Sequence, residues 1–477
     1  MNELSYISAT EAIELFKAKR LSPVELVEAV IDQAAKAEPV VNALCHQFFD
    51  EALDQARSAE QRYAGKGEPP RPLEGIPLAV KEEEAVAGQP LTEGSLIYKD
   101  QIADSSSAFA QRQLDSGAII HARSAAPEFS CAGFTQSRIW GVTRNPWNPE
   151  YSPGGSSGGS AAALASGTTT LASGSDIGGS IRIPASFCGV VGFKPPYGRV
   201  PIEPPFNLDS FCHNGPLART VADCALYQNQ IAGPDPSDIT TLRPKLILPT
   251  SFEPIGGMRI ALSTDLGGWP VDPEIRANTL AVGGALREAG AIVDEVDLQI
   301  PQADVARAAA IHFSLIFGDW VAQTIETNRE IVTDYAAEFA RQSKETSGNS
   351  TLLEALLLEA KIYAPVGALL EQYDALICPT NGTRGLLAED DYVGHGITVD
   401  GDELRNYFDA LLTTAFNVLS RCPVLSVPSG FADNGVPTGV QIVGRTYDDQ
   451  TVFRVGAALE QLRPWMDTPE RRPTIPT

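Results

Sequence analysis

The stretch that decides the fold lies at residues 151–190, which read YSPGGSSGGSAAALASGTTTLASGSDIGGSIRIPASFCGV. These forty residues contain nine Gly and nine Ser but only two charged side chains, Asp176 and Arg182. Stretches rich in Gly and Ser are usually flexible linkers, but this one is interleaved with the apolar runs AAALA, TTTLA and FCGVVGF. A buried segment of this composition indicates that the backbone approaches its neighbours closely.

Helix and strand patterns alternate on both sides of this stretch. The first 65 residues predict helices, one of which starts at Ser22-Pro23-Val24-Glu25, with an N-cap Ser, Pro at N1 and Glu at N3. Further helices are predicted at 272–288, through most of 303–375, and after Asp449. Short apolar strands are predicted at 75–80, 118–120, 258–263, 291–298, 375–378, 424–431 and 439–444, the last two joined by a tight turn at Asn434-Gly435.

Charge and cysteine usage exclude several classes of protein. The net charge is −24, with 36 basic and 60 acidic residues, which argues against binding a phosphate backbone or an anionic membrane surface. The seven cysteines are scattered without C-x-x-C spacing, so neither a disulfide framework nor a zinc site is expected. There is no run of 18 apolar residues and no apolar signal region at the N-terminus, so we expect a cytoplasmic protein without membrane spans.

Several familiar catalytic patterns do not fit this sequence. None of the five histidines lies in a Gly-rich loop or beside a plausible nucleophile. Residues 154–158 match G-x-S-x-G, but the preceding NPWNPEYSP cannot form the central strand that a nucleophile elbow requires. No Gly-Lys-Ser/Thr follows, as a Walker A loop would need, and no Ser-x-x-Lys occurs anywhere in the chain.

A second Gly-rich turn, GSDIGGSIR at 174–182, has the composition of an anion-binding nest. Adjacent small residues let successive backbone N–H groups converge on one point, and in acyl transfer such a nest serves as an oxyanion hole. Ser180, near the end of this turn, would attack the carbonyl whose oxygen the nest holds.

Together, Lys81, the loop GGSSGGSAAALASG (154–167) and the segment GSDIGGSIRIPASFCGVVGFKPPYGRV (174–200) resemble the amidase signature family. Other segments are also similar to the family: LSPVELVEAVI, LEGIPLAVK, APEF, WGVTRNPWNP, GPLARTVAD and TGVQIVGR. The resemblance covers nearly the whole chain and is weakest in 235–375. It implies a hydrolase of amide-type C–N bonds with a Ser–cis-Ser–Lys triad.

The resemblance implies a role for each matching residue. Ser180 falls on the nucleophile, Ser156 on the relay serine that follows a cis peptide bond, and Lys81 on the base. The backbone N–H groups of four residues fall on the oxyanion hole: Ile177, Gly178, Gly179 and Ser180. Lysine is normally protonated at neutral pH, so Lys81 acts as a base only where its surroundings disfavour the ammonium.

Further residues near these motifs are candidates for the site. Ser130 and Cys131 fall where members of the family line the acyl pocket. Asp176 and Arg182 flank the predicted nucleophile, and we expect them to hold the turn in shape rather than take part in the chemistry.

The run Glu82-Glu83-Glu84 departs from the family, which usually has Asp after the lysine and then a polar residue. Alternation along a strand places Glu82 on the face opposite Lys81. The run is typical of a loop carrying solvated charge, although Glu83 or Glu84 could reach the site.

The pattern predicts an α/β fold: a single large domain with a mixed, mostly parallel twisted β-sheet covered on both faces by α-helices. Within one amidase-signature domain, 1–477, we expect four parts. These are an N-terminal helical part (1–70), the catalytic core (71–235), a variable and mainly helical part (236–375), and C-terminal strands and a helix that complete the sheet (376–477).

The resemblance favours an amidase acting on a small or aryl amide through an acyl-Ser180 intermediate, with esters and carbamates (urethanes) chemically accessible. Two alternatives stay open. One is a glutaminase similar to the corresponding component of the glutamyl-tRNA amidotransferase, which would supply ammonia to a partner; the other is a non-catalytic binding protein on an amidase scaffold. No cofactor, metal, nucleic acid or membrane is expected, a homodimer stays open, and the sequence does not identify the substrate.

Overall fold

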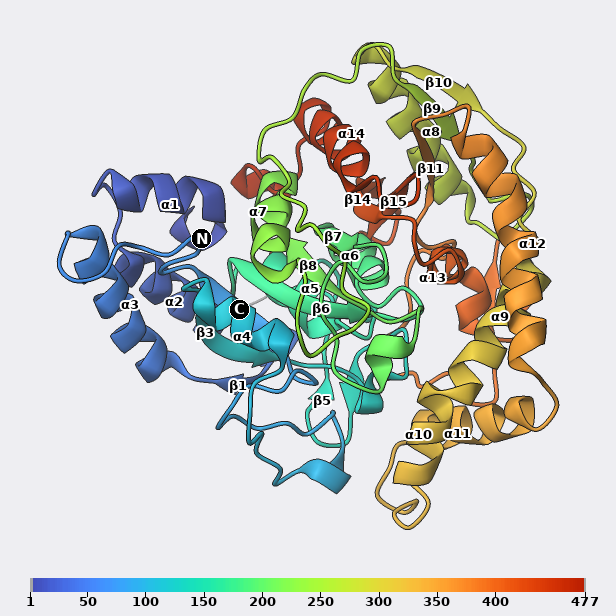
Figure 1. Ribbon diagram of the computed structural model, residues 1–477, viewed down its shortest axis with the longest axis horizontal. Coiled ribbons are helices and arrows are strands. Elements are labelled where there is room, and N and C mark those ends of the chain that lie inside the picture. Colours follow the sequence, from blue (N-terminus) through green and yellow to red (C-terminus); the bar gives the residue numbers. More distant parts are fainter. Residues whose placement is uncertain (1–2, 476–477) are drawn as a thin grey trace.

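The structure, a computed structural model, describes residues 3–475 and is built on one large twisted sheet (Figure 1). The strands of this sheet are β1 (Leu44–Gln47), β2 (Pro77–Lys81), β3 (Ile119–Ser124), β6 (Leu171–Asp176), β7 (Val191–Lys194), β8 (His213–Ala218), β9 (Arg259–Leu262), β10 (Ile292–Glu295), β11 (Ala375–Pro379), β14 (Val424–Phe431) and β15 (Pro437–Gly444). Within the described residues they form an 11-stranded sheet in the order β1-β3-β2-β6-β8-β7-β14-β15-β11-β9-β10. Two small ribbons, β4 (Gln136–Ser137) with β5 (Gly141–Val142) and β12 (Ile397–Val399) with β13 (Asp402–Leu404), lie outside it.

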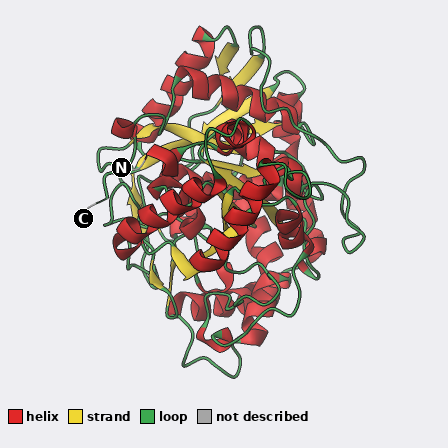
Figure 2. Cartoon of the chain, turned by 90° about the vertical axis from the view of Figure 1, so that its left-hand side faces the viewer, coloured by secondary structure: helices red, strands yellow, loops and turns green. Residues whose placement is uncertain are grey.

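Helices surround the sheet in both views (Figures 1 and 2). They are α1 (Ala9–Lys17), α2 (Pro23–Val41), α3 (Phe49–Tyr63), α4 (Ala108–Asp115), α5 (Gly158–Ser166), α6 (Arg182–Cys188), α7 (Val221–Ile231), α8 (Pro273–Glu288), α9 (Gln302–Leu315), α10 (Phe317–Thr324), α11 (Asp334–Ser347), α12 (Leu352–Leu370), α13 (Ala415–Val418) and α14 (Asp449–Leu462). Figure 1 shows α1–α3 at one end of the molecule and α9–α12 at the other. The predicted capping box at the start of α2 is present, with Ser22 as N-cap and Glu25 reaching back to it.

The sheet is mixed, as predicted, but less parallel than expected. Parallel pairing occurs on the two flanks, in β3-β2-β6 and in β11-β9-β10. The middle of the sheet, β6-β8-β7-β14-β15-β11, is antiparallel throughout, and so is the edge pair β1-β3. Parallel neighbours need a long crossover, whereas β14 and β15 are joined only by residues 432–436, so the chain returns antiparallel.

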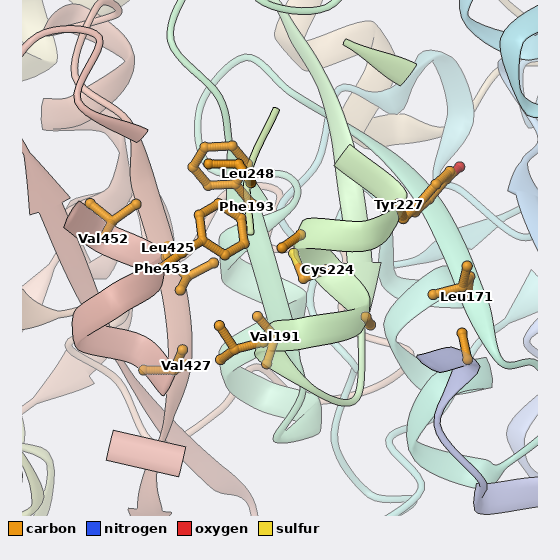
Figure 3. Close-up of a cluster of buried hydrophobic side chains, with 14 of the residues drawn as sticks. Leu171, Val191, Phe193, Cys224, Tyr227, Leu248, Leu425, Val427, Val452 and Phe453 are labelled. Atoms are coloured by element: carbon orange, nitrogen blue, oxygen red, sulfur yellow. The ribbon is translucent and has the colours of Figure 1, made fainter. Parts of the chain in front are cut away.

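Both faces of the sheet are covered, and alternation along β2 shows how this positions the site. Leu78 and Val80 point into one core, which also receives side chains from α1, α4, α7, α8 and α14. Figure 3 shows part of this core, with Phe193 of β7, Leu425 of β14 and Phe453 of α14 packed together. Ala79 points to the opposite face, toward α2, α5 and α6. Because side chains alternate along a strand, Lys81 lies on the same face as Ala79, the face that carries the Gly/Ser-rich stretch.

That stretch packs as closely as its composition predicts. A Cβ on Gly155 would lie 2.4 Å from the carbonyl oxygen of Phe134, and one on Gly159 would lie 2.4 Å from the backbone nitrogen of Ala125. Neither position has room for a side chain. The helix α5, entirely buried, can therefore lie directly against the sheet.

The bent pair α9 and α10, with 46° between its helices, passes the length-and-composition test for a membrane span only when both are taken together. No single helix of residues 3–475 passes that test.

Candidate active site

Lys81 ends β2 and is fully buried, with its amine between two hydroxyl groups. Nζ lies 2.7 Å from Oγ of Ser156 and 2.8 Å from Oγ of Ser175, which belongs to β6. The backbone N–H of Lys81 donates to Oγ of Ser173, 2.9 Å away, so β6 fixes both the strand end and the amine. The structure therefore brings the predicted base and the predicted relay serine into direct contact.

The two Gly/Ser segments meet at Ser156 and Ser180. The peptide bond between Gly155 and Ser156 is cis, as the resemblance implied. The next N–H, of Ser157, donates to the carbonyl oxygen of Ser180 at 3.1 Å, which holds the two segments side by side. Ser180 is 7% exposed, and among the hydrogen bonds of the described residues none joins its hydroxyl to that of Ser156.

The four N–H groups predicted for the oxyanion hole lie in the turn between β6 and α6, and three of them donate no hydrogen bond to another described residue. Among the hydrogen bonds of residues 3–475, none involves the N–H of Ile177, Gly178 or Ser180. The N–H of Gly179 instead donates to Oδ1 of Asp176 at 2.9 Å. In this structure the carboxylate of the same turn accepts the hydrogen bond of Gly179, and the role of this N–H group in the oxyanion hole stays a prediction. The φ of +126° at Gly179, and the 2.1 Å that would separate an added Cβ from Oγ1 of Thr413, explain why only glycine fits there.

Asp176 and Arg182 form a fully buried ion pair beneath this turn. Nε and the adjacent nitrogen of Arg182 donate to the two carboxylate oxygens of Asp176 at 3.0 and 2.9 Å. Burial opposes ionisation of Asp176, but the charge and hydrogen bonds of Arg182 outweigh it and hold the pKa of the carboxyl well below its usual value. The remaining donors of Arg182 bind Oδ1 of Asn417 and Oε1 of Gln441, each at 2.6 Å, and the backbone carbonyl of Thr413 at 2.9 Å. We call Asp176, Arg182, Asn417 and Gln441 the buried cluster; together with the Thr413 carbonyl they give every donor of the guanidinium an acceptor.

The acidic run after Lys81 is buried, so the prediction of a solvated loop is wrong. Glu82 lies on the opposite face, as alternation predicts, and accepts hydrogen bonds from the N–H groups of Thr92 and Gly94. Glu83 returns to the face of the base, with Oε1 3.0 Å from Nζ of Lys81. Burial opposes its ionisation, but Lys81 and neighbouring hydroxyls outweigh burial and lower the pKa of Glu83.

A cavity of about 300 Å³ opens on this arrangement and is lined by Ser156, Ser175 and Ile177. Of the two predicted pocket residues, Ser130 lines this cavity, where its hydroxyl donates to Glu83. Cys131 lines a separate cavity of about 700 Å³ between α9, α11 and the segment 391–414. Burial and then the carboxylate of Glu128 raise the pKa of the Cys131 thiol, which makes it a packing residue rather than a nucleophile.

Comparison with known proteins assigns the chain to a family. The model of the family described as Amidase matches residues 25–453. The chain belongs to the amidase signature family. It is 33% identical to an acylamidase of Rhodococcus erythropolis over 97% of both chains. It is 34% identical to a glutamyl-tRNA(Gln) amidotransferase subunit of Thermosynechococcus vestitus, over 94% of this chain and 96% of that one.

Solved structures agree with this assignment. A bacterial aryl acylamidase of the amidase signature family matches with a TM-score of 0.88 and 30% identity, over 96% of this chain and 97% of that chain. A 6-aminohexanoate cyclic dimer hydrolase matches with a TM-score of 0.82 and 27% identity, over 99% of both chains. The protein is thus an amide hydrolase with the fold of this family, and the predicted family, fold class and enzyme class are confirmed.

Several residues of this amidase site escaped the sequence interpretation. Asn417 and Gln441 come from the last quarter of the chain; the only signal was a polar residue inside the apolar strand GVQIVG. His213 lines the 300 Å³ cavity, and burial followed by the nearby Lys194 lowers its pKa to about 3. It is therefore neutral at physiological pH. Among the described residues, no group of three or more His, Cys, Asp or Glu side chains is placed to hold a metal ion.

Proposed function

We propose that this amidase hydrolyses a small or aryl amide through an acyl-Ser180 intermediate, with Ser156 relaying a proton to Lys81. The observation that supports the proposal most is the 2.7 Å hydrogen bond between Nζ of Lys81 and Oγ of Ser156, next to the 177–180 turn. Serine is a weak nucleophile unless a base reaches it directly or through a relay. This contact supplies the first half of such a relay.

The chemistry then follows in two halves. Neutral Lys81 accepts the proton of Ser156, which takes the proton of Ser180 as its Oγ forms a bond to the substrate carbonyl carbon. The negative charge on the carbonyl oxygen faces the free N–H groups of Ile177, Gly178 and Ser180. The relay returns its proton to the leaving nitrogen, the C–N bond breaks, and a water molecule attacks the acyl-enzyme by the same route.

Glu83 contacts the amine of Lys81 and affects its proton transfer. Its carboxylate lies 3.0 Å from Nζ, so it stabilises the ammonium that Lys81 becomes on accepting a proton. Ser175, 2.8 Å from Nζ, holds the amine in place during both states.

The size of the cavity supports a small substrate. At about 300 Å³ it lies at the lower end of the range for small-molecule sites. Esters and carbamates present the same carbonyl to the same nucleophile, so they belong to the proposed range. We also propose that the protein acts in the cytoplasm and without an obligatory partner.

A second candidate is a glutaminase, which the similarity to the glutamyl-tRNA(Gln) amidotransferase relative favours at 34% identity. It predicts that the protein hydrolyses glutamine and purifies together with another protein. Purification of the native protein, followed by assays on glutamine and acetanilide, separates the two candidates.

Covalent trapping tests the proposed nucleophile. A fluorophosphonate should label wild-type protein on Ser180, as located by mass spectrometry of its peptides, and Ser180→Ala should carry no label. Ser186→Ala, a buried serine further along α6, is the matched control and should label as wild type does. A label on any other residue would remove Ser180 from the mechanism.

A further inference from the structure

The 300 Å³ cavity beside the candidate catalytic residues has an aromatic side. Trp320 meets Phe129 edge to face, with ring centroids 5.7 Å apart, and meets Phe206 in the same way at 5.9 Å. Phe317 stacks on Trp320 at 6.3 Å, and Phe109 completes the aromatic lining. Trp320 and Phe317 come from α10, so the variable helical part supplies two of these five aromatic residues.

The lining of the same cavity also includes four glutamates, which we call the acidic wall: Glu83, Glu84, Glu93 and Glu203. Only Glu83 has a cationic partner, Lys81. Glu203 accepts the N–H of Ala108 at 2.8 Å and is exposed at the mouth of the cavity. The cavity therefore holds three carboxylates for which the described residues provide no ion pair.

Two of these carboxylates have few partners of any kind. Glu84 is only 8% exposed, yet its single side-chain hydrogen bond comes from Ser107 to Oε2, and Oε1 has no partner among the described residues. The carboxylate of Glu93 forms no hydrogen bond or ion pair within residues 3–475. Burial, followed by the charge of Glu83, raises the pKa of Glu84 to about 7 and that of Glu93 well above its usual value.

No basic side chain of the protein compensates for these charges from within the cavity. Among the described residues, no Lys or Arg lines it, and its one histidine, His213, is neutral. Arg123 is close behind the wall, but it donates to the backbone carbonyls of Lys81 and Glu82 at 3.0 and 3.1 Å rather than to a carboxylate. Burying a carboxylate without a cationic partner costs free energy. A cation that enters the cavity can form the ion pair that the protein itself does not provide.

We infer that this amidase takes a substrate that carries a permanent or protonated ammonium group beside an apolar or aromatic body, and that the acidic wall and Trp320 bind this group. Carboxylates attract the charge, and the face of an indole ring attracts an alkylammonium through the ring quadrupole. The inference rests on the proposed function, because it is Ser156 and Ser175 in the lining that make this cavity a substrate site.

A pair of isosteric anilides tests the inference. We compare 4-(trimethylammoniomethyl)acetanilide with 4-neopentylacetanilide, which have the same shape and differ in charge, with the methylene group separating the charge from the leaving nitrogen. Wild-type kcat/KM should favour the cationic substrate by about tenfold or more, the scale of a desolvated cation–π contact together with a charged hydrogen bond. In the double variant Glu84→Gln/Glu93→Gln this ratio should fall on the order of tenfold.

Glu51→Gln, an exposed glutamate on α3, is the matched control and should leave both rates unchanged. Equal rates for the two anilides, or a ratio that the double variant leaves unchanged, would overturn the inference while the proposed amidase function stands.

Binding of benzyltrimethylammonium to Ser180→Ala protein, measured by titration calorimetry, separates the inference from the proposed function. Binding that weakens in the Glu84→Gln/Glu93→Gln background supports the inference even if neither anilide is cleaved, in which case the proposed function fails alone. Absence of binding overturns the inference whatever the turnover results.

Discussion

The buried cluster and two glutamates of the acidic wall, Glu84 and Glu93, both place carboxylates next to the candidate catalytic residues, but they differ in how those carboxylates are partnered. In the buried cluster, the carboxylate of Asp176 faces the guanidinium of Arg182, and Asn417 and Gln441 also accept hydrogen bonds from it. In the acidic wall, Glu84 and Glu93 have no cationic partner among the described residues.

This difference distinguishes charged residues that stabilise the fold from charged residues that bind a ligand. A buried ion pair with every hydrogen bond made fixes the geometry around it, and Asp176 also accepts the N–H groups of Gly179 and Ile181 on either side of Ser180. Buried carboxylates without partners stabilise nothing in the free protein, and such departures from good packing chemistry concentrate where a ligand binds. The two regions should therefore respond in opposite ways when their charges are removed.

The largest effect is expected in the buried cluster. Arg182→Met leaves the charge of Asp176 buried without a partner, and breaking a buried pair in this way costs about 3–5 kcal/mol of unfolding free energy. Urea unfolding followed by circular dichroism measures the change. Arg259→Met is the matched control: it removes an ion pair with Asp294 whose side chains are 50% and 45% exposed, and it should cost less than about 1 kcal/mol. Similar losses in both variants would show that the buried cluster has no special structural role.

A smaller effect of opposite sign is expected in the acidic wall. Because the folded protein raises the pKa of Glu84 from 4.5 to about 7, the folded state keeps a proton that the unfolded chain loses between these values. Stability contributed by this group is therefore present at low pH and lost as the pH rises through about 7. Glu84→Gln, which can still accept from Ser107, should match wild type near pH 4.5 and exceed it by about 1–3 kcal/mol at pH 8.

Thermal unfolding at several pH values measures this difference, with Glu51→Gln again as the exposed control. A Glu84→Gln protein that is less stable than wild type at pH 8 would show that the carboxylate is well partnered after all. The contrast between the two regions would then disappear.

The sequence predicted elements best where apolar periodicity is strong. Strands such as 424–431 and 439–444 match β14 and β15, and the helical part 303–375 holds α9–α12. The sequence did not predict the strands β6 and β8, because the residues of LASGSD and HNGPLA are mostly small or polar and show no alternation of β-branched side chains. Their pairing depends on α5 packing flat against them, which is a tertiary effect.

The candidate site was predictable in its centre and not in its surroundings. Motif resemblance assigned Lys81, Ser156 and Ser180, and the first two lie in contact. The role of Glu83 was not predicted: β2 ends at Lys81, a turn brings Glu83 back to the base, and the run of three acidic residues was interpreted as solvent-exposed. Trp320 and Phe317 of the aromatic lining come from α10, far away in sequence, and no local pattern connects them to the triad.

The most direct test of the relay from Lys81 through Ser156 to Ser180 is a double-mutant cycle on the rate at which a fluorophosphonate reacts with Ser180. Lys81→Ala and Ser156→Ala should each slow this reaction by about 10²–10⁴-fold, the usual range for a proton-transfer catalyst. If the two residues act as one unit, the double variant should be no slower than the slower single variant. Losses that multiply in the double variant, or a Ser156→Ala protein that reacts at the wild-type rate, would contradict the relay.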